Sequence, residues 1–200
     1  MTVEVIMTTP EHLIGEMAKI CYATKQLEDG GKDITSTIVH DYKHLASLRF
    51  AYATVTLEGI SVACQNQIVR SSHLSFMVQS KRYVSADKGE FQFIMPENIS
   101  SSHQWVLKEN WDNSIALYQS LLATGMKKED ARAILPANTS TKMNISGNLQ
   151  GWLSFFKLRL SSKAQTEIRN VAKEIWNQLA LHFPLVLTDN LYKEYTECKH

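Results

Sequence analysis

Cysteine is scarce in this sequence, and the three cysteines that occur are far apart. Cys21, Cys64 and Cys198 form no CxxC pair. Zinc knuckles and disulfide frameworks both depend on characteristic cysteine spacings, so neither is indicated. We expect no metal site, and we predict that the three cysteines are small buried hydrophobic residues.

Long apolar runs and an excess of charge are lacking too. No stretch approaches the roughly 18 apolar residues of a membrane span, and the start, MTVEVIMTTPEH, has no basic segment followed by an apolar core. Lysine and arginine total 21 against 20 acidic residues, which gives no general attraction to nucleic acid or to anionic membranes. We expect a cytoplasmic protein that binds neither, in which any anion site is local.

The motifs of common enzyme classes are also missing. The sequence has no glycine-rich phosphate loop, HExxH, GxSxG or Pro-Cys nucleophile. What it does have is 200 residues with 44% hydrophobic content, enough for one domain with a sizeable core. Strand-like and helix-like segments alternate without a regular βαβ order, which predicts an α+β fold over 1–200 with a polar tail at about 188–200.

Apolar residues at helical spacing predict the helices. The first follows Thr9 as a cap and Pro10 in its first turn. Its apolar face would hold Leu13, Ile14, Met17, Ile20 and Cys21. Further helices are predicted over 40–48, over 59–70 with Gly59 at the start, and over about 103–124, 127–134, 148–160 and 163–183. In the helix over 148–160 the apolar positions are Leu149, Trp152, Leu153, Phe156 and Leu158.

Aromatic, β-branched and threonine-rich segments predict the strands. These are FAYATVTLE at 50–58, an extended FQFIMP that ends at Pro96, and NTSTKMNISG at 138–147.

Arginines on otherwise apolar segments are the main chemical signal. These are Arg70, Arg82, Arg132, Arg159 and Arg169. A buried guanidinium without an anion is costly, so each of them needs a carboxylate or a phosphate. Structural ion pairs and a phosphate site are both open on this ground alone.

Several short motifs occur in an order that resembles the flavin-dependent thymidylate synthases, from about residue 5 to 186. That family has CY at the end of its first helix, then EGxSxAxxxQxVRHR, SxRYV, ARxxLP, LRxxxxAQxEIR and a terminal HFP. This chain has Cys21-Tyr22, LEGISVACQNQIVRSS, SKRYV, ARAILP, LRLSSKAQTEIR and HFP. The resemblance implies an α+β fold with a central antiparallel or mixed sheet flanked by helices, and a homotetramer whose active sites are shared between subunits.

The implied reaction is methylation of dUMP at C5. Carbon would come from methylenetetrahydrofolate and reducing equivalents from NADPH through FAD, without attack by a protein cysteine. The positions that bind dUMP in the family are matched by Gln67, Ser80, Arg82, Arg132 and Arg159. Arginine forks and a serine hydroxyl suit a phosphate, and a glutamine amide suits the uracil or sugar. Ser80 and Arg159 are the catalytic candidates; a capped turn and surface ion pairs are the structural alternatives.

The cofactor side is altered. The family's RHR is Arg70-Ser71-Ser72 here, and in its later NxR motif Asn148 is kept while Gln150 replaces the arginine. An acidic or amide position becomes Val78, next to Gln79. His73 either compensates for the lost cations or is a structural histidine.

A histidine that gates cofactor access in the family is matched by His44, in KHLASLRF where the family has GHESVLEH. An ordinary surface histidine is the alternative. Each lost charge-assisted hydrogen bond is worth roughly 1.5 to 3 kcal/mol, so FAD binding should be weakened. Three functions stay open: the usual reaction, an altered C5 chemistry such as hydroxymethylation or use of another pyrimidine nucleotide, and non-catalytic nucleotide binding.

Overall fold

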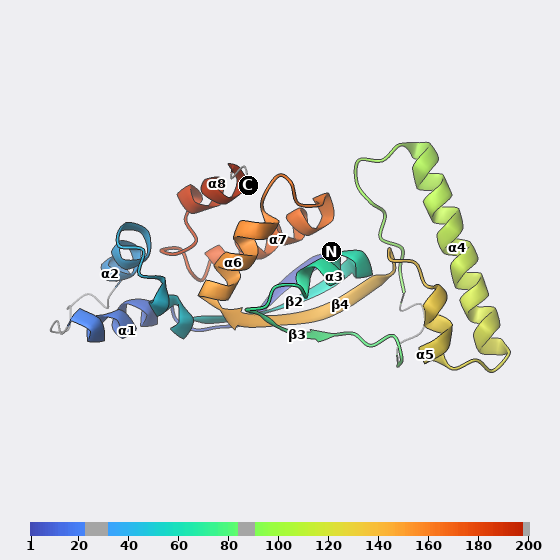
Figure 1. The fold of residues 1–200 in the computed structure, drawn as a ribbon, viewed down its shortest axis with the longest axis horizontal. Coiled ribbons are helices and arrows are strands. Elements are labelled where there is room, and N and C mark those ends of the chain that lie inside the picture. The colour runs from blue at the N-terminus through green and yellow to red at the C-terminus, as the bar shows by residue number, and fades with distance from the viewer. Residues whose placement is uncertain (23–31, 84–90, 198–200) are drawn as a thin grey trace.

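Four antiparallel strands form the centre of the molecule, in the order β1-β2-β4-β3 (Figure 1). The computed structural model describes residues 1–22, 32–83 and 91–197. The strands are β1 Thr2–Thr8, β2 Tyr52–Ser61, β3 Ser75–Val78 and β4 Ser140–Asn148. The α+β prediction and the strands predicted at 50–58 and 138–147 are confirmed, whereas β1 and β3 were missed, and the extended segment FQFIMP makes only an isolated bridge, between Phe93 and Thr139. A register shift between Val5 and Met7 breaks the two-residue alternation of β1, which is the signal for a strand.

The sheet has one apolar and one polar face because successive side chains of a strand point to opposite sides. In β2, Ala53, Val55 and Leu57 are fully buried. On the other face, Thr54 Oγ1 lies 2.8 Å from Ser146 Oγ of β4. Further along the same face, Thr56 Oγ1 donates to Asn144 Oδ1 and Lys142 pairs with Glu58.

Helices cover the apolar face and extend the molecule at both ends (Figure 1). They are α1 Leu13–Tyr22, α2 Lys32–Ser36, the π-helix η1 Thr37–Asp41, the 3-10 helix η2 Leu45–Phe50, α3 Val62–Ile68, α4 Ser101–Ala123, α5 Lys128–Ala131, the 3-10 helix η4 Arg132–Ile134, α6 Leu149–Arg159, α7 Thr166–Ala180 and α8 Asp189–Glu197. α3, α6 and α7 lie over the sheet, with α1 and α2 at one end and α4 and α5 at the other. Among the described helices, none is long and apolar enough to cross a bilayer.

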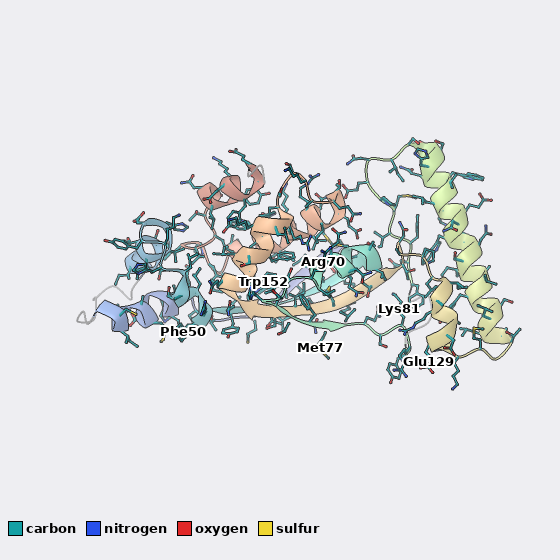
Figure 2. All side chains as sticks on the ribbon, viewed as in Figure 1. Phe50, Arg70, Met77, Lys81, Glu129 and Trp152 are labelled. Carbon is teal, nitrogen blue, oxygen red and sulfur yellow. The ribbon has the colours of Figure 1, made fainter. Side chains whose placement is uncertain are left out.

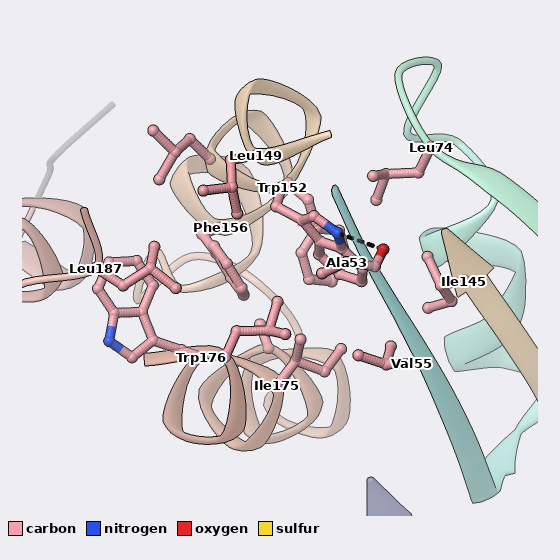
Figure 3. Close-up of a cluster of buried hydrophobic side chains, with 14 of the residues drawn as sticks. Ala53, Val55, Leu74, Ile145, Leu149, Trp152, Phe156, Ile175, Trp176 and Leu187 are labelled. Atoms are coloured by element: carbon pink, nitrogen blue, oxygen red, sulfur yellow. Dashed lines mark hydrogen bonds between the residues drawn. The ribbon is translucent and has the colours of Figure 1, made fainter. Parts of the chain in front are cut away.

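Aromatic side chains join α6 to the sheet and to α7 (Figure 3). Trp152 is fully buried, and its Nε1 donates to Ala53 O at 3.2 Å. Its ring stacks on Phe156 with a centroid separation of 5.9 Å, and Phe156 meets Trp176 of α7 edge-on at 5.0 Å. This packing fixes both ends of α6, the helix that carries several of the predicted site residues. Leu158, predicted to share the apolar face, is 55% exposed.

The predicted polar tail is helical over most of its length, because residues 189–197 form α8. Tyr195 is only 8% exposed, and its ring lies 6.2 Å from that of Trp176. Tyr192 lies 5.4 Å from the same indole. Together with Leu191, these two tyrosines dock one side of the short helix, while its charged residues remain solvated.

The predicted apolar face of the first helix is only partly correct. Ile14 is buried as expected, but Ile20 is 79% exposed and Cys21 is exposed as well. Thr9 does not cap this helix, because its Oγ1 accepts from the backbone N–H of Tyr52 at 2.8 Å. α1 packs at one end of the sheet, so only its inner edge meets the core.

Gly59 does not open a helix, contrary to the prediction. It has a φ of +75° inside β2, where the pairing with β4 shifts register between Glu58 and Ile60. The helix begins later, with Ser61 as its cap accepting from the Cys64 N–H at 2.9 Å. Cys64 is buried as predicted, whereas Cys198 lies outside the described residues. The helix predicted over 40–48 is divided between η1 and η2.

Candidate functional site

Two of the predicted nucleotide-binding residues are in direct contact. Arg159 is the last residue of α6, and its Nη2 donates to Gln67 O in α3 at 2.6 Å. The side-chain Nε2 of Gln67 in turn donates to Gln165 Oε1, just before α7. The ends of three helices therefore meet at Arg159, which we call the Arg159 cluster: Gln67, Arg159, Gln165 and the adjacent Arg70.

Among the described residues, no carboxylate forms an ion pair with the two arginines of the Arg159 cluster. Arg159 Nε is buried and has no hydrogen-bond partner within the described part of the chain. Burial and, secondarily, the charge of Arg70 lower the pKa of the Arg159 guanidinium. Two guanidinium groups in this setting are stabilised by an anion that contacts both.

The other predicted nucleotide residues form a second group on the far side of β3. Arg82 Nε and Nη2 lie 3.0 and 2.8 Å from Glu129 Oε2. Arg132 Nε donates to the backbone oxygen of the same Glu129 at 3.0 Å. The side chains of Arg82 and Glu129 are 54% and 38% exposed, so their pair contributes little to stability.

Ser80 belongs to this second group and makes a turn. Its Oγ accepts from Arg82 N at 3.3 Å, and its carbonyl accepts from Tyr83 N at 3.2 Å. The capped-turn alternative for Ser80 is therefore present in the structure. The same bond orients the chain so that Arg82 follows directly on the exposed side of the turn.

One chain does not bring the five nucleotide residues together. Figure 2 shows Arg70 at the end of α3 above the middle of the sheet, and Glu129 beside α5 at one end of the molecule. Within 1–22, 32–83 and 91–197, no hydrogen bond or ion pair joins the Arg159 cluster to the group of Ser80, Arg82 and Arg132.

Three of the predicted cofactor-side residues, His73, Asn148 and Gln150, lie where the loop after α3 meets the start of α6. Asn148 caps α6, and its Oδ1 accepts from Gly151 N at 2.9 Å. A Cβ at Gly151 would lie 2.6 Å from His73 O, so the absence of a side chain there allows the loop to approach the helix. A cavity of about 190 Å³ lies at this contact, lined by Arg49, His73, Asn148, Gln150, Gly151 and Ser154. We call it the α6 cavity.

The three residues that stand for the family's RHR differ in their environments. Arg70 and Ser72 are exposed. Ser71 Oγ is buried and has no hydrogen-bond partner among the described residues. A buried hydroxyl without a partner is unfavourable, so Ser71 is the residue of the three whose environment best suits a polar ligand atom.

Gln79 and His44 lie outside the α6 cavity. The backbone N–H of Gln79 donates to Lys142 O at 2.8 Å and extends the pairing of β3 with β4. His44 is exposed, precedes η2 and lines a separate, mainly apolar cavity of about 420 Å³ with Met17, Cys21 and Phe50. Of the eight cofactor residues predicted, the structure brings together His73, Asn148 and Gln150.

Two residues near the site were not predicted. Arg49 Nε donates to Gln150 Oε1 at 2.6 Å, and Gln165 completes the Arg159 cluster. The sequence held a signal for Arg49, since KHLASLRF has arginine at a position where the family string GHESVLEH has glutamate. Gln165 was part of the quoted AQTEIR motif, but nothing in its spacing pointed to Gln67.

Lys81 and Cys64 have shifted pKa values but are turned toward the interior. Burial lowers the pKa of Lys81 to about 8, although its Nζ donates to Ser140 O at 2.9 Å and lies over the ring of Phe91. Burial, with a smaller effect of Glu167, raises the pKa of the Cys64 thiol. Both effects favour the protonated thiol, which is the less nucleophilic form.

Comparisons with known proteins identify relatives of the whole folded unit. The family described as thymidylate synthase complementing protein matches residues 4–185. The flavin-dependent thymidylate synthase of Pyrococcus furiosus is 37% identical over 145 residues, which are 70% of this chain and 59% of that protein. That of Clostridium tetani is 30% identical over 209 residues, covering 92% of this chain and 81% of that protein.

A solved structure has the same fold. The crystal structure of thymidylate synthase X from Helicobacter pylori with FAD and dUMP superposes with a TM-score of 0.82, covers 96% of this chain and 99% of that chain, and is 20% identical. The likeness confirms the arrangement of a four-stranded antiparallel sheet under helices. With the family match over residues 4–185 and a relative aligned to 92% of its length, this chain belongs to the flavin-dependent thymidylate synthase family.

Proposed function

We propose that this protein methylates dUMP at C5 to give dTMP. The carbon comes from methylenetetrahydrofolate, the reducing equivalents come from NADPH, and FAD is the resident cofactor. The names of the relatives support this proposal, as does the Helicobacter structure, which contains FAD and dUMP.

The single observation that carries the proposal is the uncompensated charge of the Arg159 cluster. Arg159 has a buried Nε without a partner, and Arg70 adds a second positive charge nearby. Neither forms an ion pair with a described carboxylate. A nucleotide monophosphate supplies the missing anion, and the amide of Gln67 beside it suits the oxygens and N–H of a pyrimidine.

The residues present also fit the polar edge of FAD. Ser71 Oγ is a buried hydroxyl that lacks a partner within the described residues, and the α6 cavity is lined by polar side chains, none of them acidic. His73, Asn148 and Gln150 would hold the cofactor there. When bound, FAD supplies the hydride that reduces the transferred carbon to a methyl group.

The chain's own residues bind and orient the substrate. The Arg159 cluster holds the nucleotide at the meeting point of three helix ends, where Gln67 and Gln165 fix the arginine. Arg82 and Arg132 bind the phosphate from a second subunit, which displaces the exposed Glu129 carboxylate. Cys64 is buried and the pKa of its thiol is raised, so this residue is not used to activate C5.

Product analysis tests the reaction directly. The purified protein should show a flavin spectrum, and incubation with dUMP, methylenetetrahydrofolate and NADPH should give dTMP, identified by mass. An Arg159→Ala protein purified in the same way serves as the control and should form none. A hydroxymethyl product would replace the proposal with altered C5 chemistry, and nucleotide binding without flavin or turnover would replace it with a non-catalytic role.

We further propose a homotetramer with shared sites, because one chain separates Arg159 from Arg82 and Arg132. Light scattering should report four subunits, and mixing two inactive variants should restore activity. When Arg159→Ala and Arg82→Ala protomers are unfolded and refolded together, about one quarter of the sites regain both arginines if the subunits mix at random.

Two controls frame the mixing experiment. Each variant refolded alone should stay inactive, and the double variant Arg82→Ala/Arg159→Ala mixed with either single variant should recover nothing, because no intact pair can form. If the two single variants show no recovery although mass spectrometry detects mixed tetramers, the assignment of these arginines to different subunits is wrong.

A further inference from the structure

Arg49 is an exposed cation whose side chain is hydrogen-bonded to a neutral partner. It lies in η2, and its Nε donates to Gln150 Oε1 near the start of α6 at 2.6 Å. Its two terminal nitrogens have no hydrogen bond or ion pair within 1–22, 32–83 and 91–197. Gln150 thus orients the guanidinium without neutralising it, whereas a carboxylate in the same place would cancel the charge.

The contact between Arg49 and Gln150 differs in charge from the family motifs at both positions, since the acidic position is basic here and the basic position is neutral. Where the family strings carry glutamate in GHESVLEH and arginine in NxR, this chain carries Arg49 and Gln150. The two substitutions meet in space, since the side chains are hydrogen-bonded. A guanidinium is therefore retained at this contact, on η2 instead of α6.

The side chain of Arg49 lines the α6 cavity. Arg49 and Gln150 line it together with His73, Asn148 and Ser154, and no acidic residue is part of its lining. Ser71, whose Oγ is buried without a described partner, lies in the same loop as His73. A small polar cavity with an exposed arginine and no carboxylate suits an anionic group, and a guanidinium fork suits a phosphate best.

We infer that Arg49 is the cofactor-binding cation of this chain: held by Gln150, it binds the pyrophosphate of FAD in place of the arginine that Gln150 replaces. The inference rests on the proposed use of FAD and assigns the contact to a residue on a different element. It also explains how the chain tolerates the loss of arginine at position 150.

Binding measurements on the purified oligomer test the inference without turnover. FAD and riboflavin, which lacks phosphate, are titrated by flavin fluorescence at low and high salt. Arg49→Ala should weaken FAD binding by roughly 10- to 100-fold, the loss of one charge-assisted contact, and leave riboflavin unchanged. The difference in FAD affinity between the parent protein and Arg49→Ala should become smaller as the salt concentration rises, because exposed charges are screened.

A second variant keeps the shape of the contact and removes its charge. Gln150→Glu should weaken FAD binding to a similar extent, because the new carboxylate pairs with Arg49 and neutralises it. Lys157→Ala removes an exposed cation elsewhere on α6 and should leave FAD affinity unchanged. Thermal melts of each variant establish that the fold is retained.

The outcomes separate the inference from the proposed function. If the unmodified protein binds FAD and Arg49→Ala binds it equally well, the inference falls while the proposed function stands. Equal losses of FAD and riboflavin affinity would move the contact from the pyrophosphate to the flavin ring and overturn the assignment. If the unmodified protein binds no flavin at all, both fail.

Discussion

Replacing Arg159 with alanine is expected to weaken dUMP binding by about 100-fold or more. Its guanidinium is held by Gln67 O at 2.6 Å, and its Nε is buried without a described partner. A nucleotide anion that bonds this nitrogen gains charge-assisted hydrogen bonds, which the alanine variant cannot make. Calorimetric titration of dUMP into both proteins measures the change.

The stability of the Arg159→Ala protein should change much less than its affinity. The substitution removes one hydrogen bond, but it also removes a buried guanidinium close to the positive charge of Arg70. Arg169→Ala is the matched control, since Arg169 Nη1 likewise donates to a backbone oxygen, that of Ser162, at 2.9 Å. If Arg159→Ala keeps nearly the parent affinity for dUMP while Arg169→Ala loses affinity for dUMP, we have placed the nucleotide at the wrong arginine.

Replacing Gly151 with alanine is expected to destabilise the protein and to disrupt the cofactor side. The new Cβ would lie 2.6 Å from His73 O and 3.2 Å from His73 Cβ, so the loop must move away from α6. Overpacking of this kind costs about 1 to 3 kcal/mol. The gain in helix propensity from glycine to alanine is at most about 1 kcal/mol, so the net effect is a loss.

The two ligands should respond differently to Gly151→Ala. FAD affinity should fall more than tenfold, because His73 lines the α6 cavity and moves with the loop. dUMP affinity should change little, because Arg159 is at the opposite end of α6. Titrations measure the FAD and dUMP affinities, and denaturant unfolding measures the stability. Lys157→Ala is the control on the same helix. An alanine variant as stable as the parent, with unaltered FAD affinity, would contradict the close approach at His73.

Most elements of the fold could be predicted from local patterns. β2 and β4 alternate in polarity along their length, and α7 places Ile168, Ala172, Ile175 and Leu179 on one buried side. Elements with weak or interrupted patterns could not. β1 contains a register shift, and α8 docks through three residues, Leu191, Tyr192 and Tyr195, among charged neighbours.

The candidate site could be predicted as a set of residues but not as an arrangement. The motifs identified Gln67, Arg82, Arg132 and Arg159 by their order along the chain. The order of the motifs along the chain does not show which of these residues are in contact. The folded chain places Arg159 against Gln67, whereas Arg82 pairs with Glu129 at the other end of the molecule. Distances between residues far apart in sequence depend on how helices dock on the sheet.

By itself, the sequence determined the α+β class, the family and the residue types available for an anion, since these follow from local periodicity and from motifs read in order. Only the tertiary structure shows that Arg49 is hydrogen-bonded to Gln150. It also shows that the loop at His73 packs directly against Gly151. The physical reason is that both contacts join segments far apart in the chain: Arg49 and Gln150 are 101 residues apart, and His73 and Gly151 are 78 residues apart. Such contacts form only when the core around Trp152 brings η2, the loop after α3 and α6 together.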